Sequence, residues 1–218
     1  MCQGLTGPTI DGKDEWYLDN ETHRRFIKSV QEIRASKPNA ARVTALIEPL
    51  FQNLLSDSNW LPEHFQEPSG TSGMGGGIGM WLLYRSGDGD LAFSSLVVPA
   101  GASTPVHDHL AWGIVGLYRG NQDEEVFTRR DDGAVEGKAS LDTLERRSLT
   151  PGDLYQLSPE TDIHRVRTTS DQTSVSLHLL GNDNGCIMRH RFYPNEGRVE
   201  PFKSGWLNVP CLEHAAAD

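Results

Sequence analysis

The chain has 218 residues and a formal net charge of −10 at pH 7, because 30 Asp and Glu outnumber 20 Lys and Arg. A protein that binds nucleic acid or an anionic membrane surface by neutralising phosphates needs the opposite sign, so we expect neither partner. The length suits one domain, with enough buried surface to fold without a disulfide or zinc staple. The three cysteines are far apart and form no C-x-x-C pair, which argues against a disulfide framework.

The first residues are neither basic nor apolar, so they do not resemble a secretory signal. No run approaches the ~20 apolar residues of a membrane-spanning helix. We therefore expect a cytoplasmic protein. The composition says nothing about oligomeric state.

Residues 1–19 are polar and glycine-rich and are expected to be loose. Residues 20–68 are expected to be a helical segment packed on the core, because apolar side chains recur there at helical spacing. Pro38-Asn39 divides this stretch and predicts two helices, with Pro49 as a potential kink in the second. Three histidines outside the β-rich region are expected at the surface: His23, His64 and His214.

Residues 69–218 have a different character, with short β-rich runs separated by Gly, Pro and Asp turns. Several short strands at this spacing are typical of an all-β sandwich or barrel. The candidate strands are Met80–Arg85, Leu91–Val98, Gly113–Tyr118, Glu125–Arg130, Leu154–Leu157, His164–Thr168 and Ser174–Leu180.

Histidines mark the candidate chemistry of this β-rich region. His107 and His109 flank a single residue, and in an extended chain residues i and i+2 point to the same face. Both imidazoles can therefore reach one metal ion, and His164 begins a later strand. Ser176 and His178 also share a face of their strand, by the same spacing.

The spacing of Gly101, His107, His109 and Gly120 matches the motif G-x5-H-x-H-x3/4-E-x6-G except at its glutamate. A Gly-Asp turn at 152–153, then Pro159 and His164, matches a second motif loosely, with the proline one place late. Together they resemble the cupins. The resemblance implies a mainly β fold, a double-stranded β-helix or jelly-roll barrel, here carrying an N-terminal helical layer and a C-terminal extension.

The glutamate of the common cupin site should stand at about position 113, where this chain has Gly113. The remaining ligands are three neutral histidines on one face, His107, His109 and His164, which leave coordination positions open for a substrate and O2. Imidazoles bind several divalent metals, so ligand type does not choose among Fe, Ni, Cu, Zn and Mn. The alternative is that these histidines are buried in a barrel that binds no metal.

A three-histidine cupin of this size resembles the thiol dioxygenases, which act on cysteine or 3-mercaptopropionate, and the resemblance covers roughly residues 75–207. It implies an Fe(II) ion on the three histidines and a relay of Ser176 and His178. It also implies that both atoms of O2 are added to the sulfur of a small thiol carboxylate, giving a sulfinate. Arg189, eleven residues after His178, matches the carboxylate-binding arginine of the 3-mercaptopropionate branch. The early strand offers Met80 and Trp81 where the cysteine branch has its arginine.

The third relay position is Leu180, where the relatives have tyrosine. Because leucine has no hydroxyl, we expect either a bulkier or more apolar substrate, or a hydroxyl supplied by Tyr84, Tyr118 or Tyr155. The Cys–Tyr crosslink of some relatives cannot form, because position 113 has no cysteine either.

Two other functions remain open from the sequence alone. Three-histidine cupins resembling this one also cleave carbon–carbon bonds in β-diketones and flavonols. A cupin that only binds its ligand, or isomerises it without O2, is the third alternative. Cys186 is expected near the arginine clamp, and its role is not indicated by the sequence.

Overall fold

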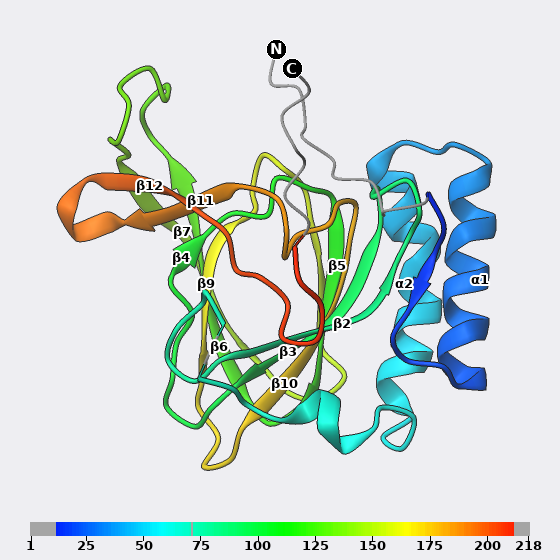
Figure 1. Cartoon of the computed structure of the whole chain (residues 1–218). Coiled ribbons are helices and arrows are strands. Elements are labelled where there is room, and N and C mark those ends of the chain that lie inside the picture. Colours follow the sequence, from blue (N-terminus) through cyan, green and yellow to red (C-terminus); the bar gives the residue numbers. More distant parts are fainter. Residues whose placement is uncertain (1–11, 71, 212–218) are drawn as a thin grey trace.

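The computed structural model describes residues 12–70 and 72–211, so Cys2 and His214 lie outside the described residues. Two antiparallel six-stranded sheets face each other as a jelly-roll barrel, which confirms the expected fold class (Figure 1). In spatial order, the first sheet contains β1 (Glu15–Trp16), β2 (Gly79–Arg85), β3 (Ala92–Val98), β10 (Ser174–Leu180), β5 (Gly113–Arg119) and β8 (Leu154–Leu157). The second contains β12 (Arg198–Phe202), β11 (Arg189–Tyr193), β4 (Val106–His107), β9 (Ile163–Thr168), β6 (Gln122–Arg129) and β7 (Leu141–Leu149).

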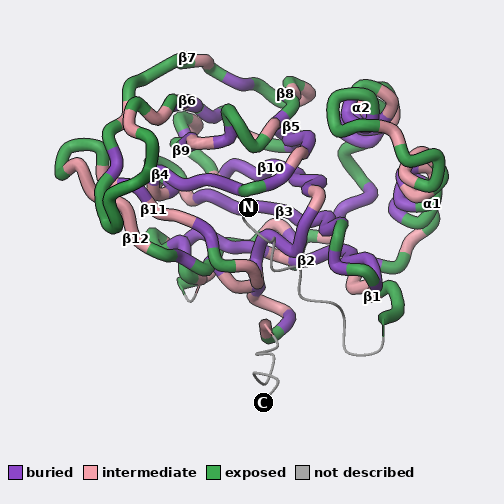
Figure 2. The backbone as a smooth tube through the Cα atoms, turned by 90° about the horizontal axis from the view of Figure 1, so that it is seen from above, coloured by how far each residue is buried: buried purple, intermediate pink, exposed green. Residues whose placement is uncertain are grey.

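The two predicted helices are confirmed as α1 (Glu21–Ala35) and α2 (Ala40–Ser56). Each begins after an asparagine, Asn20 and Asn39, whose side chain accepts a hydrogen bond from a first-turn backbone N–H. Figures 1 and 2 show both helices on one side of the barrel, with their buried sides toward the first sheet. Gly116 on β5 permits this close approach, because a Cβ atom there would lie 2.5 Å from Leu55.

Among the described residues, no helix has the length and apolar composition needed to cross a bilayer. A short 3-10 turn, Glu63–Gln66, follows the helices, and another, Pro194–Glu196, joins β11 to β12.

The side chains of strand β10 alternate between the core under the helices and the interior of the barrel. Val175, Leu177 and Leu179 pack into the core shared with the helices. The alternate residues, from Ser176 to Leu180, point into the barrel. The helical layer therefore covers the outside of the sheet, and the inner face is left for chemistry.

All seven predicted strands are present, with small differences at their ends. Strand β7 was not predicted because most of its side chains are exposed and its apolar residues do not alternate. Strand β1, at 15–16, pairs with β2 inside a segment that was expected to be loose.

No disulfide was expected from the sequence, and this prediction is wrong. Cys186 and Cys211 form a disulfide, with their Cα atoms 5.1 Å apart. The β11–β12 hairpin lies between them and reverses the chain. Two residues 25 positions apart in sequence are thus neighbours in space, which their sequence spacing does not reveal.

His23 was expected at the surface, and this prediction is wrong, whereas His64 is exposed as expected. The His23 ring is fully buried on α1 and stacks near Phe93 and Trp60. Its Nδ1 donates to the Leu18 carbonyl at 2.7 Å. Burial lowers the pKa of His23 to about 4.

This burial predicts a pH-dependent stability. The unfolded chain binds the His23 proton near pH 6.5 and the folded chain only near pH 4, so acidification through that window favours unfolding. The lost stability is roughly 3 kcal/mol once pH is below both values. Urea unfolding of wild type and His23→Gln across this window should show a shallower acid loss in the variant. The matched variant His64→Gln should keep the wild-type slope, and equal slopes for all three proteins would contradict the assignment.

Candidate metal centre

The three predicted metal ligands come together between the sheets. His107 ends β4, His109 follows two residues later, and His164 lies opposite His107 on β9. Their ring centroids are 4.8–5.0 Å apart. One ring nitrogen from each lies within 4.8 Å of the others, and all three side chains are buried. This is the arrangement of ligands on one face of a single cation.

The protonation of these histidines suits a metal ligand. Burial, followed by the charge of nearby groups, lowers the pKa values of His107 and His109 well below the usual range. Both are therefore neutral at neutral pH, which is the form that binds metals. His107 uses Nδ1 to donate to the Pro105 carbonyl at 2.9 Å, which leaves Nε2. Within the described residues, Nε2 of His164 and Nδ1 of His109 are buried without a hydrogen-bond partner. The donor set fits a divalent cation.

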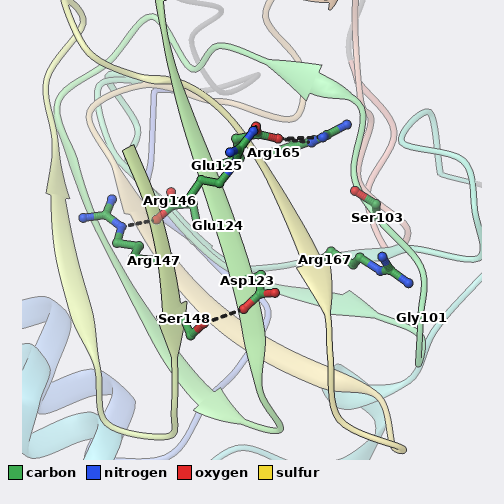
Figure 3. Close-up of a pocket in the computed structure, with 10 residues that line it drawn as sticks. All are labelled: Gly101, Ser103, Asp123, Glu124, Glu125, Arg146, Arg147, Ser148, Arg165 and Arg167. Carbon is green, nitrogen blue, oxygen red and sulfur yellow. Dashed lines mark hydrogen bonds and ion pairs between the residues drawn. The ribbon is translucent and has the colours of Figure 1, made fainter. Parts of the chain in front are cut away.

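Glu124 orients the third ligand and was not predicted from the sequence. One carboxylate oxygen of Glu124 lies 2.5 Å from Nδ1 of His164. The other lies 2.5 Å from Nε of Arg147 (Figure 3). Burial alone would raise the pKa of Glu124, but the hydrogen bonds to His164 and Arg147 outweigh it and lower that pKa. The guanidinium of Arg147 lies 4.2 Å from the Tyr155 ring centre. The sequence feature that could have identified Glu124 is an acidic residue at an inward-facing position of β6. The predicted strand began at Glu125, one residue after Glu124, whereas β6 begins at Gln122.

The chain around His109 is held from two sides. Asp162 accepts from the backbone N–H groups of His109 and Leu110, at 2.8 and 2.6 Å. Asn182 donates to the His109 carbonyl at 2.9 Å. Leu110 has a φ of +57°, which a bulky residue adopts only when its surroundings enforce it. These contacts fix the direction of the His109 side chain.

Gly113 and Leu180 are neighbours, which explains both departures from the family pattern. They lie opposite each other on β5 and β10. A Cβ atom at Gly113 would lie 2.4 Å from Cδ2 of Leu180. The leucine therefore occupies the space that a side chain at position 113 would need.

Of the three tyrosines considered from the sequence, only Tyr155 lies beside the histidines. Its ring centre is 6.3 Å from that of His164, and it shares a buried apolar cluster with Leu180. Burial, with the charge of Glu124, raises the pKa of Tyr155 well above its usual range. Tyr84 and Tyr118 belong instead to the core on the helical side.

Ser176 and His178, predicted as a relay from the resemblance, contact each other. Ser176 Oγ lies 2.9 Å from Nε2 of His178, and both are buried. The His178 ring centre is 6.3 Å from that of His109. Burial lowers the pKa of His178 to about 3, so its imidazole is neutral at neutral pH.

Arg189 is a buried cation near the cluster. It is 1% exposed, and its charge helps lower the pKa values of His107 and His109 after burial itself. Its Nη1 donates to the Asp108 carbonyl at 2.7 Å and its Nη2 to Ser204 Oγ at 2.9 Å. Burial lowers the pKa of Arg189 to about 10, so it stays protonated at neutral pH. No described carboxylate forms an ion pair with it.

The groove of Figure 3 lies on the other, outer face of β6, β7 and β9. Glu125 there pairs with Arg146 and Arg165, each at 2.6 Å. None of the three clustered histidines lines this groove. We assign the chemistry to the barrel interior and not to this groove.

Glu124 generates a prediction about metal affinity. Carboxylates that orient a ligating histidine typically contribute 10–100-fold to metal binding. Glu124→Gln should therefore bind Fe(II) or Zn(II) about tenfold more weakly or worse, in a chelator competition. The matched control is Glu125→Gln, which changes the neighbouring residue on the outer face. Unchanged affinity in Glu124→Gln would remove this carboxylate from the site.

Comparison with known proteins places this geometry in context. The family model described as cysteine dioxygenase type I matches residues 79–187, which is half of the 218 residues. Similar solved structures include Peruvianin-I, described as a cysteine peptidase from Thevetia peruviana latex. It is 21% identical, covers 59% of this chain and 75% of its own, and has a TM-score of 0.42. A cupin 2 domain-containing protein from Halorhodospira halophila is 18% identical over 49% of this chain and 61% of its own, with a TM-score of 0.36. An oxalate oxidase in complex with the substrate analogue glycolate is 13% identical over 59% and 61%, with a TM-score of 0.42.

This chain thus spans about three fifths of the length of the last two proteins. The family match contains the three clustered histidines together with Ser176 and His178, and it ends two residues before Arg189. The chain belongs to the cysteine dioxygenase type I family.

Proposed function

We propose that this protein is an Fe(II)-dependent dioxygenase that adds both atoms of O2 to the sulfur of a small thiol carboxylate, giving a sulfinate. The observation that carries the proposal is a buried cluster of three histidines, of which His107 and His109 are neutral, beside a buried arginine. Among the described residues that arginine has no ionised partner in contact. The family match supports the same class of chemistry.

The chain would hold iron through His107, His109 and His164. Fe(II) bound there would supply the redox chemistry that lets O2 react with a thiol. Because none of the three ligands is a carboxylate, none of them offsets the charge of the cation, which favours an anionic thiolate over the neutral thiol. Glu124 keeps the His164 ring oriented through its Nδ1.

Arg189 would bind the substrate carboxylate and so orient the sulfur. The protein already fixes its guanidinium, because Nη1 and Nη2 each donate to the chain and the group lies 4.7 Å from the Phe202 ring centre. Nε is buried with no acceptor among the described residues. Asp108 and Asp162 stabilise its charge from a distance, but burial outweighs them and lowers the pKa of Arg189. A carboxylate in direct contact would relieve the remaining cost of burial.

His178 would act as a neutral hydrogen-bonding group beside the reacting atoms. Ser176 uses its hydroxyl to hold the Nε2 side of the ring. A neutral imidazole can donate through one nitrogen and accept through the other, so it can serve either a thiol or an oxygen atom. Leu180 makes the neighbouring wall apolar, and Tyr155 is the hydroxyl nearest to the histidines among the three tyrosines compared.

The class of reaction can be tested by oxygen consumption with anaerobically Fe(II)-loaded protein. A suitable panel contains 3-mercaptopropionate, cysteine, mercaptosuccinate, cysteamine and one β-diketone. We expect uptake matched by sulfinate from a thiol carboxylate. Uptake with two carbonyl fragments from the diketone would support carbon–carbon cleavage instead. No uptake with any compound, iron being bound, would indicate a cupin without O2 chemistry.

Arg189 carries a separate prediction about substrate affinity. A hydrogen bond to a charged group contributes about 1.5–3 kcal/mol, so Arg189→Ala should raise KM for carboxylate thiols roughly ten- to hundredfold. The KM for cysteamine, which has no carboxylate, should change little. The matched control is Arg191→Ala, because Arg191 lies 4.5 Å from the same Phe202 ring and is not fully buried. An unchanged KM for carboxylate thiols in Arg189→Ala would exclude Arg189 as the clamp.

A further inference from the structure

A single hydroxyl connects Arg189 to the loop that follows β10. Ser204 Oγ accepts from Nη2 of Arg189 at 2.9 Å and donates to the backbone carbonyl of Asn184 at 3.5 Å. Arg189 and Asn184 therefore lie on the two sides of Ser204. All three side chains are buried, and Asn184 is only 3% exposed.

Both residues carry a hydrogen-bond donor that is not used. Nε of Arg189 and Nδ2 of Asn184 are buried, and neither finds an acceptor among the described residues. Leaving a buried donor unsatisfied costs about 1–3 kcal/mol, and native proteins rarely do so. The two unused donors belong to residues that both contact Ser204, Arg189 through Nη2 and Asn184 through its backbone carbonyl. This proximity is the basis for considering one acceptor with more than one lone pair for both donors.

The loop is firmly held, so it cannot easily relax to satisfy these donors from within the chain. Cys186 is bonded to Cys211, and the N–H of Gly205 donates to the Gly185 carbonyl at 2.8 Å. Nε1 of Trp206 donates to Asp183 at 2.8 Å. Donors fixed in this way bind a ligand without an ordering cost.

The surroundings favour an anion over a water molecule. Met74 contacts Nη2 of Arg189 through its sulfur, and Phe202 lies against the guanidinium. Both belong to one buried apolar cluster that also contains Trp206. A cation and an amide N–H next to apolar side chains are complementary to a carboxylate, which has two oxygens to accept both donors.

We propose that Asn184 is a second substrate-binding residue, whose Nδ2 donates to the carboxylate of a small thiol carboxylate that Arg189 also binds. The inference rests on the proposed function and extends it, because it makes carboxylate recognition a property of two residues. A neutral amide adds a donor without adding charge. It therefore selects a carboxylate over an amino group at the same position.

Two variants of Asn184 test this assignment. Asn184→Leu keeps the approximate size and removes the donor, and Asn184→Asp keeps the shape and introduces repulsion. Binding of 3-mercaptopropionate to the anaerobic Fe(II)-loaded protein is measured by calorimetry, so that no turnover occurs. We expect Kd to rise about tenfold in Asn184→Leu and further in Asn184→Asp. Met188→Ala, an exposed change in the same loop, should leave Kd unchanged.

The outcomes separate the inference from the proposed function. Wild-type binding with unchanged Kd in Asn184→Leu would overturn the role of Asn184 and leave the proposed function standing. Equal or tighter binding by Asn184→Asp would overturn it as well, and this nearly isosteric variant decides the question if the leucine variant does not fold. Failure of the wild-type protein to bind any carboxylate thiol would contradict the proposed function itself.

Discussion

The burial of three imidazoles against one another is the constraint on which the rest of the site depends. Buried histidines bind protons poorly, because the charged form loses its hydration and would repel its neighbours. His107 and His109 are therefore neutral, with their lone pairs available to a cation. Among the described residues, the ionised group hydrogen-bonded to the cluster is Glu124, and Arg147 on its other carboxylate oxygen balances its charge. Glu124 and Arg147 together thus add no net charge beside the cluster.

The strands of the first sheet use one face for the apolar core and the other face for the polar residues of the candidate site. On β10, alternate side chains enter the core under the helices, and the others face the barrel. The helical layer provides the apolar burial for the first sheet. This leaves the interior free to hold Ser176 and His178, which would be costly in a packed apolar core unless they were hydrogen-bonded.

The parts of the fold and site that depend on local rules could be predicted from the sequence. The two-residue spacing of His107 and His109 predicted that both side chains reach one site, although β4 ends at His107. Pro38-Asn39 predicted the break between the two helices. The parts that depend on register or chain reversal could not. Glu124 meets His164 only because β6 pairs with β9, and Cys186 meets Cys211 only because a hairpin turns back between them.

The central claim is that both atoms of one O2 molecule enter the sulfur of a thiol carboxylate. It is tested most directly by turnover under oxygen-18 gas in ordinary water, followed by mass spectrometry of the product. The account predicts a sulfinate in which both added oxygen atoms carry the label. A product with one labelled oxygen, or with none, would show that water supplies the remainder and would contradict the account.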